Sequence, residues 1–157
     1  MLRQANLIAL LVPAALLAGA WGFQLIGGLY PCEMCHWQRW PHYAALPVAA
    51  LAFWAEGRTR VVLVALAALL IAASGAVGVA HAGVEYHWWQ GFTACTSPVA
   101  LTGRTAAERL ANLMNQPIVR CDAPQWSIAG VSLAGLNALV SLGGAAVIAA
   151  LLTRRTR

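Results

Sequence analysis

Two pairs of cysteines are the residues best able to do chemistry in this sequence. Cys32 and Cys35 form a C-x2-C motif where one long apolar stretch ends and another begins. Cys95 and Cys121 lie in the long polar loop that follows the third apolar stretch. Thiol–disulfide exchange requires a thiolate that attacks another sulfur, so the two pairs must be close and accessible. Their placement is therefore typical of proteins that move electrons as thiols and disulfides.

The sequence around the C-x2-C motif favours a reactive thiolate. Pro31 precedes Cys32, and proline suits the first turn of a helix. The dipole and the unpaired N–H groups of a helix start favour a thiolate there over a thiol. Cys32, Cys35 and Arg39 are spaced i, i+3 and i+7, so they share one helix face. We expect one stripe with two sulfurs and a permanent positive charge.

Ionisable residues in apolar stretches are further candidates. A charged Arg39 would cost about 2.5–3.5 kcal/mol at mid-bilayer, so a thiolate or the carbonyl of a lipid-soluble quinone should face it. Alternatively, its guanidinium extends to the lipid headgroups. His81 could hydrogen-bond a quinone oxygen or deliver a proton. Glu85, one turn later, fits a quinone site or an interfacial carboxylate. The remaining histidines are predicted to be interfacial: His36, His42 and His87.

Other uses of four cysteines remain open. The pairs could be purely structural disulfides, or all four could bind zinc. A zinc site would normally show a second close pair, whereas Cys95 and Cys121 are far apart in the sequence. We therefore predict no metal.

The composition places the chain in a membrane. It has 157 residues, of which 61% are hydrophobic and only 10% charged, compared with about a quarter charged in soluble domains. Four stretches are long enough for a hydrocarbon core of roughly 30 Å: residues 6–30, 32–55, 61–86 and 127–153. We predict an all-α membrane protein with a single domain, residues 1–157, built as an antiparallel bundle of four transmembrane helices. A cleaved signal peptide is the alternative for the first stretch, although its apolar run is longer than usual.

The charges predict the orientation. All ten basic residues are arginines. Arg3, Arg58, Arg60 and the three arginines of the C-terminal tail share one side, so the positive-inside rule places both termini in the cytoplasm. The cysteines then face outward, where disulfides persist. No basic face suits a nucleic acid. Aromatic residues gather at the outer ends of the stretches, as in an interfacial belt: Tyr30, Trp37, Trp40, Tyr43, Tyr86, Trp88, Trp89 and Trp126.

The long loop, residues 87–126, contains a helix signal. Thr105 and Glu108 have the spacing of a capping box, and Leu110, Leu113 and Met114 follow at helical spacing. We expect a short amphipathic helix that lies on the bilayer surface or packs on the loop.

Small residues predict where helices meet. They recur every four residues in the third and fourth stretches, a spacing that allows close helix approach: Ser74, Gly78 and Ala82, and Gly130, Ala134 and Ala138. Asn137 and Ser141 are expected to hydrogen-bond between helices.

The cysteine motifs resemble those of a known family. The segment Pro31-Cys32-Glu33-Met34-Cys35-His36-Trp37-Gln38-Arg39 resembles the membrane-edge motif of the DsbB family of disulfide-bond-formation proteins. The segment Cys121-Asp122-Ala123-Pro124-Gln125-Trp126, with the later Gly135-Leu136-Asn137, resembles the end of that family's second periplasmic loop. The likeness covers nearly the whole chain. At the position of Gln38 some relatives carry an acid.

The resemblance implies an inner-membrane enzyme that reoxidises a DsbA-like periplasmic thioredoxin-fold oxidase and passes electrons to quinone, either ubiquinone or menaquinone. It implies that Cys95 forms the mixed disulfide with this partner and that Cys121 exchanges with Cys32. Cys35 would donate electrons to the quinone, with Arg39 fixing the headgroup and His81 close by.

Two other functions fit parts of the pattern. A membrane dithiol could reduce a quinone or its epoxide, as in proteins similar to vitamin K epoxide reductase, but those usually place the C-x2-C motif late in the bundle. A non-enzymatic four-span protein could use its disulfides only as staples. The presence of Arg39 near the C-x2-C motif makes this alternative less favoured, because a purely structural disulfide needs no cation beside it.

Overall fold

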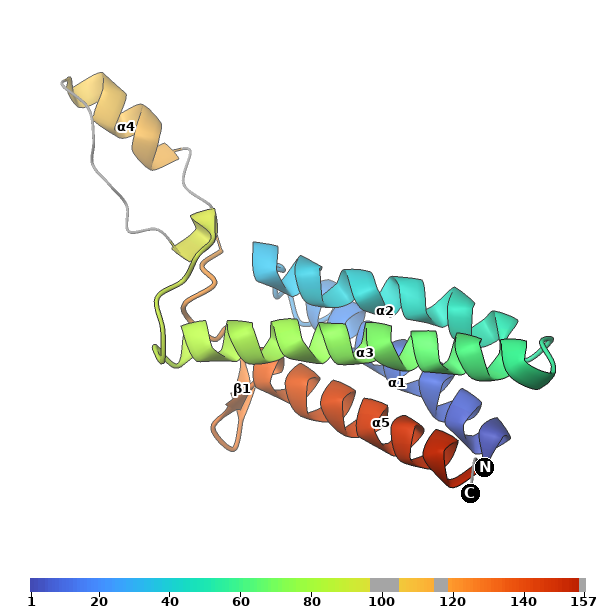
Figure 1. Ribbon diagram of the computed structural model, residues 1–157. Coiled ribbons are helices and arrows are strands. Elements are labelled where there is room, and N and C mark those ends of the chain that lie inside the picture. Colours follow the sequence, from blue (N-terminus) through green and yellow to red (C-terminus); the bar gives the residue numbers. More distant parts are fainter. Residues whose placement is uncertain (97–104, 115–118, 156–157) are drawn as a thin grey trace.

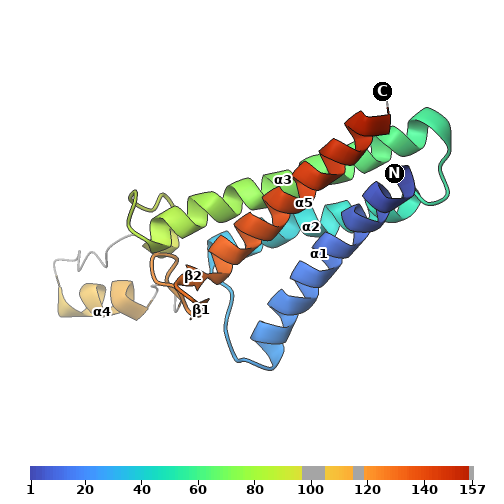
Figure 2. The same cartoon turned by 90° about the horizontal axis from the view of Figure 1, so that it is seen from below.

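Four long helices dominate the computed structural model, which describes residues 1–96, 105–114 and 119–155. They form an antiparallel bundle (Figure 1): α1 (Leu2–Leu25), α2 (Glu33–Leu51), α3 (Gly57–Glu85) and α5 (Leu133–Arg155). A short 3-10 helix η1 (Ala94–Thr96), helix α4 (Ala106–Met114) and strands β1 (Ser127–Ile128) and β2 (Val131–Ser132) lie between α3 and α5. Both termini and the α2–α3 connection lie at one end of the bundle, and the loop lies at the other (Figures 1 and 2).

Three of the helices are long and apolar enough to cross a membrane: α1, α3 and α5. Helix α2 packs beside α1 and α3 but is less apolar, because its first half contains Gln38, Arg39 and three aromatic or imidazole rings. Its 19 residues would measure roughly 28 Å at 1.5 Å per residue. The protein is therefore a helical membrane protein, and α2 as a fourth crossing stays a prediction.

The last long helix starts later than the sequence pattern suggested. Residues 127–132 form the β1–β2 hairpin, whose central residues Ala129 and Gly130 have φ of 50° and 79°. Positive φ at both central positions is the geometry of a type I′ hairpin turn. The Tyr86 hydroxyl donates to the Gly130 carbonyl (2.9 Å) and accepts from the Ser132 N–H (2.8 Å). The predicted start at residue 127 is wrong, and Gly130 belongs to a turn instead of a helix-packing face.

Small residues bring the helices together. A Cβ atom on Gly78 of α3 would lie 3.0 Å from the Ala134 carbonyl and 3.0 Å from the Ala138 N–H nitrogen of α5. The predicted close approach of these two helices is confirmed at Gly78, Ala134 and Ala138. Alanines also fill the main apolar core, whereas large side chains such as Leu69 and Leu139 point outward. An apolar exterior around a small-residue interior suits a bundle surrounded by lipid.

The loop is anchored to the bundle on one side. The Trp89 ring covers Gly83, where a Cβ would come within 2.0 Å of the ring, and its Nε1 donates to the Ala80 carbonyl (3.0 Å). The two capping contacts of Thr105 and Glu108 are present at 3.2 Å each, at the start of α4. Helix α4 extends away from the bundle (Figures 1 and 2), and its contact with a bilayer surface stays a prediction.

Candidate thiol–disulfide site

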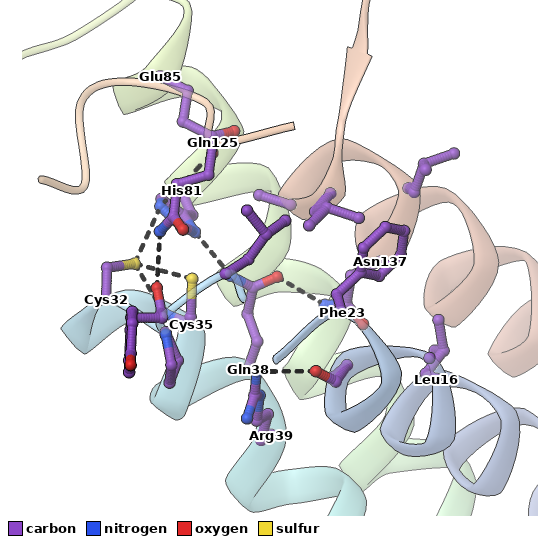
Figure 3. A pocket seen from close by; sticks show the side chains of 18 of the residues that line it. Leu16, Phe23, Cys32, Cys35, Gln38, Arg39, His81, Glu85, Gln125 and Asn137 are labelled. Atoms are coloured by element: carbon purple, nitrogen blue, oxygen red, sulfur yellow. Dashed lines mark hydrogen bonds and ion pairs between the residues drawn. The ribbon is translucent and has the colours of Figure 1, made fainter. Parts of the chain in front are cut away.

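Cys32 caps the start of α2. Its backbone is extended (φ −77°, ψ 174°), and its sulfur accepts a hydrogen bond from the Cys35 N–H (3.2 Å). The predicted position of Cys32 at the helix start is confirmed. Both cysteines are free thiols, and their sulfurs lie 2.8 Å apart (Figure 3). The Cys32 thiol can therefore donate a hydrogen bond to Cys35 when Cys35 is a thiolate.

Cys95 and Cys121 are joined by a disulfide bond, and their Cα atoms are 5.6 Å apart. The Thr93 hydroxyl lies 2.9 Å from the Cys95 sulfur. Both cysteines are buried in one hydrophobic cluster with Cys32, Met34 and other apolar side chains, and Cys35 packs against it. The fold therefore brings all four cysteines together at the same end of the bundle.

His81 of α3 connects the cysteine pairs. Its Nε2 lies 3.6 Å from the Cys32 sulfur and 3.8 Å from the Glu85 Oε1. The ring also interacts with the Cys121 backbone. The second carboxylate oxygen of Glu85 accepts a hydrogen bond from the Ser132 hydroxyl. His81 and Glu85, which the sequence indicated, are thus both beside the dithiol.

Gln38 is a site residue that sequence reasoning overlooked. Its amide nitrogen donates to the Met34 carbonyl (3.2 Å) and lies 2.7 Å from His81 Nδ1 (Figure 3). A carbonyl can only accept, so the amide orientation is fixed and His81 Nδ1 must accept as well. A neutral His81 therefore carries its proton on Nε2, which faces the Cys32 sulfur. That N–H can stabilise a Cys32 thiolate.

The polar chain continues from Gln38 into the bundle. The Asn137 amide nitrogen donates to Gln38 Oε1 (2.9 Å). The amide oxygen of Asn137 lies 3.1 Å from His42 Nε2. Ser74 and Ser141 complete the group through short contacts to His42 Nε2 (2.8 and 3.3 Å). The predicted interhelical role of Asn137 and Ser141 is confirmed.

His42 corrects an expectation. It was predicted to be interfacial, but only 2% of it is exposed. The reason is its register: Met34, Gln38 and His42 are spaced every four residues on the buried face of α2. The spacing i, i+3 and i+7 from Cys35 through Gln38 to His42 is a signal that could have revealed this.

Arg39 points from α2 toward α1. Its Nη1 donates to Gln24 Oε1 (2.6 Å) and its Nη2 to the Ala20 carbonyl (3.4 Å), and the guanidinium lies 5.9 Å from the centre of the Trp21 ring. Among the described residues it has no acidic partner. Its charge is held by neutral acceptors, so it retains donor capacity for a further group.

A cavity of about 230 Å³ opens beside the dithiol. Apolar side chains from α1 and α5 line it, including Leu16, Phe23 and Leu136. Polar groups come mostly from α2 and α3: Cys32, Cys35, Gln38, Arg39, His42 and His81. Apolar walls with donors at one side fit a planar, lipid-soluble ring that carries hydrogen-bond acceptors.

The loop covers part of this cavity. Arg120, Ala123 and Gln125 contribute to its lining, and the Gln125 amide donates to the Tyr30 carbonyl (2.8 Å). The Arg120 guanidinium binds both carboxylate oxygens of Asp122, a contact that lowers the pKa of that carboxyl. The segment that carries Cys121 is therefore held by an internal ion pair, Arg120 with Asp122, and by a hydrogen bond from Gln125 to the α1–α2 connection.

The dithiol and His81 also offer possible metal ligands. One atom each of Cys32, Cys35 and His81 lies within 4.8 Å of the others, as a thiophilic cation would require. No observation beyond this proximity indicates a metal, and the expectation of none stays a prediction.

Comparison with known proteins identifies the family. The family model described as "Disulfide bond formation protein DsbB" matches residues 2–151, which is nearly the whole chain. Comparisons with curated proteins and with solved structures give no match. The matched region includes helices α1, α2 and α3, most of α5 and both cysteine pairs. On this evidence of sequence and fold, the chain belongs to the DsbB family of membrane proteins that form disulfide bonds.

Proposed function

We propose that this protein oxidises the dithiol of a DsbA-like periplasmic thioredoxin-fold protein and passes the two electrons to quinone in the inner membrane. One observation carries the proposal: the Cys32–Cys35 dithiol borders the cavity that Arg39 lines and packs in one cluster with the Cys95–Cys121 disulfide. In this proposal α2 is the fourth crossing, the termini are cytoplasmic and the cysteines are periplasmic.

The first half of the cycle exchanges disulfides. A thiolate of the partner attacks the Cys95 sulfur, the Cys95–Cys121 bond breaks, and a mixed disulfide forms. The partner's second thiolate then releases the partner as a disulfide and leaves Cys95 and Cys121 as thiols. Cys121 next attacks Cys32 of an oxidised Cys32–Cys35 pair, and Cys95 resolves that intermediate. The loop disulfide is restored, and two electrons and two protons now reside on Cys32 and Cys35.

The second half of the cycle oxidises the Cys32–Cys35 dithiol. Quinone supplies the electron sink, because it takes up two electrons and two protons to become a hydroquinone. Within the chain, Cys35 borders the cavity as the donor, and Arg39 offers N–H groups to a ring oxygen. His81 Nε2–H, held by Gln38, faces the sulfur of Cys32 and stabilises its anionic form. The two thiols leave this step as a disulfide, ready for Cys121.

The test separates electron exit from partner exchange. A Cys35→Ser variant should lose quinone-dependent reoxidation of a reduced DsbA-like substrate, since no Cys32–Cys35 disulfide can form. The matched control is His36→Ser, which changes the exposed neighbour on the same turn and should turn over normally. Normal turnover by Cys35→Ser would exclude the proposed exit.

The partner is tested by trapping. In a Cys121→Ala variant Cys95 is a free thiol, and its thiolate should attack the disulfide of an oxidised thioredoxin-fold partner. The partner's disulfide breaks, and the mixed disulfide persists because Cys121 is absent and cannot release Cys95. Adding Cys95→Ala should remove the adduct. An adduct that persists without Cys95 would contradict the assignment of this cysteine.

A further inference from the structure

His42 presents a buried ring nitrogen that none of the described residues uses. The side chain lines the cavity together with Arg39 and Cys35, and it is 2% exposed. Its Nε2 has three close polar contacts, whereas its Nδ1 has no hydrogen-bond partner among the described residues. An unpaired polar atom in a buried position is unfavourable, so a partner from the cavity would relieve it.

The surrounding hydroxyl groups fix which nitrogen carries the proton. The Ser74 hydroxyl donates to the Gln38 carbonyl (2.7 Å), and the Ser141 hydroxyl donates to Asn137 Oδ1 (3.1 Å). Each hydroxyl has one hydrogen, so with these bonds made neither hydroxyl donates to His42 Nε2, which faces acceptors alone, the nearest being Ser74 Oγ at 2.8 Å. His42 Nε2 therefore carries the proton, and in the neutral ring Nδ1 is a bare acceptor.

The orientation of Asn137 supports the same assignment. Its amide nitrogen donates to the Ser74 carbonyl (3.2 Å) and to Gln38 Oε1 (2.9 Å). The amide oxygen must then face His42, where it accepts from Nε2 (3.1 Å). The protonation pattern thus depends on backbone carbonyls of α2 and α3, which can only accept.

We propose that His42 Nδ1 accepts a hydrogen bond from a hydroxyl of the bound hydroquinone, so that the cavity binds the reduced ring more tightly than the oxidised ring. This inference rests on the proposed function and adds the residue that sets redox-state preference. The carbonyl oxygens of a quinone only accept and leave Nδ1 unpaired. Arg39 only donates and can serve the oxygens of either form. His42 is the group that distinguishes the two.

The preference would help to drive the reaction. The dithiol delivers two electrons and two protons, and the ring leaves as hydroquinone while Cys32 and Cys35 form a disulfide. By linkage, the factor by which the cavity favours hydroquinone over quinone is also the factor by which it shifts the reduction equilibrium inside the site. A stronger preference for hydroquinone also slows its release, because hydroquinone is the product that must leave the cavity.

Ring binding, measured apart from turnover, tests the inference. Full-length protein with Cys35→Ser, which cannot complete the reaction, is titrated anaerobically with duroquinone and with durohydroquinone by calorimetry. His42→Gln is then added. The glutamine amide can reach the position of Nε2 and keep its contacts with Asn137 and Ser74, but it leaves no acceptor at Nδ1. Durohydroquinone should bind about tenfold more weakly, the effect of one ordinary hydrogen bond, and duroquinone should change by less than about twofold.

Two variants serve as controls. His42→Asn can place its Oδ1 near the position of Nδ1, and it should keep the preference for durohydroquinone. Gly143→Ala adds a methyl group on α5 that meets nothing within 4 Å and does not line the cavity, so it should change neither affinity.

The outcomes distinguish the two proposals. Equal weakening of both ligands by His42→Gln, or no weakening, overturns the role of His42 and leaves quinone binding intact. Failure of the parent to bind either ligand overturns the cavity as a quinone site as well. If His42→Gln does not fold, as judged by its thermal transition, His42→Phe takes its place, because its ring also has no acceptor at Nδ1: retention of the preference for durohydroquinone in that variant contradicts the inference, and its loss supports it.

Discussion

Replacing Gln38 with methionine should slow the chemistry of a cysteine that Gln38 does not touch. Gln38 holds His81 by a 2.7 Å hydrogen bond to Nδ1, and His81 Nε2 lies 3.6 Å from the Cys32 sulfur. Methionine has a similar length but no amide. His81 is then free to move its proton to Nδ1 or to rotate, and either change removes the donor that faces Cys32.

The size of the effect follows from the bond that is lost. An ordinary hydrogen bond contributes about 0.5–1.5 kcal/mol net, which corresponds to a roughly 2- to 13-fold decrease in the reactivity of the Cys32 thiolate. The unfolding free energy should also fall, by about 1–3 kcal/mol, because His81 Nδ1 becomes a buried group without a partner. Asn137 loses less, since Ser74 still accepts from its amide.

The assay is alkylation of Cys32 by iodoacetamide at fixed pH, followed by mass spectrometry. A Cys35→Ser background with the loop disulfide intact leaves Cys32 as the single free thiol. Ser141→Ala is the control, because it removes a contact further along the polar chain and should leave the rate unchanged.

A double-mutant comparison tests the reasoning directly. In a His81→Phe background, adding Gln38→Met should have no further effect on the alkylation rate, because the donor is already gone. If Gln38→Met slows Cys32 equally with and without His81, then the substitution acts through access to the cavity, and the argument about the tautomer is refuted.

The remaining predictions concern the cavity and the helix packing. Arg39→Ala should raise the quinone KM by about tenfold or more, since a charge-assisted bond contributes about 1.5–3 kcal/mol, and should leave mixed-disulfide trapping at Cys95 unchanged. Equal losses in the two assays would count against its assignment to the quinone. Gly78→Ala should lower the unfolding free energy by about 1–3 kcal/mol, because its Cβ would press on the backbone of α5. Gly143→Ala, with nothing within 4 Å of the new Cβ, should not destabilise in the same detergent unfolding assay. A similar loss for both glycines would mean that close helix contact is not the cause.

Much of the site could be predicted because it depends on local physics. The position of Cys32 at the start of α2 follows from what a helix start leaves unpaired, because its sulfur accepts the free N–H of Cys35. The contacts of Thr105 with Glu108 likewise depend on neighbours three residues apart. Hydropathy, which sums over single residues, was sufficient to indicate three membrane-type helices. Helix α2 is less apolar, and its buried polar residues Gln38 and His42 face other helices.

Only the tertiary structure decided which polar residues meet. The chain from Cys32 through His81, Gln38 and Asn137 to His42 joins three helices, and its contacts span up to 99 positions in the sequence. Such contacts depend on how each helix is rotated and where it crosses its neighbours. A shift of one residue on α2 turns a side chain by about 100° and would send His42 toward lipid. The sequence alone determined the types of groups at this end of the bundle, and helix packing determined that they form one site.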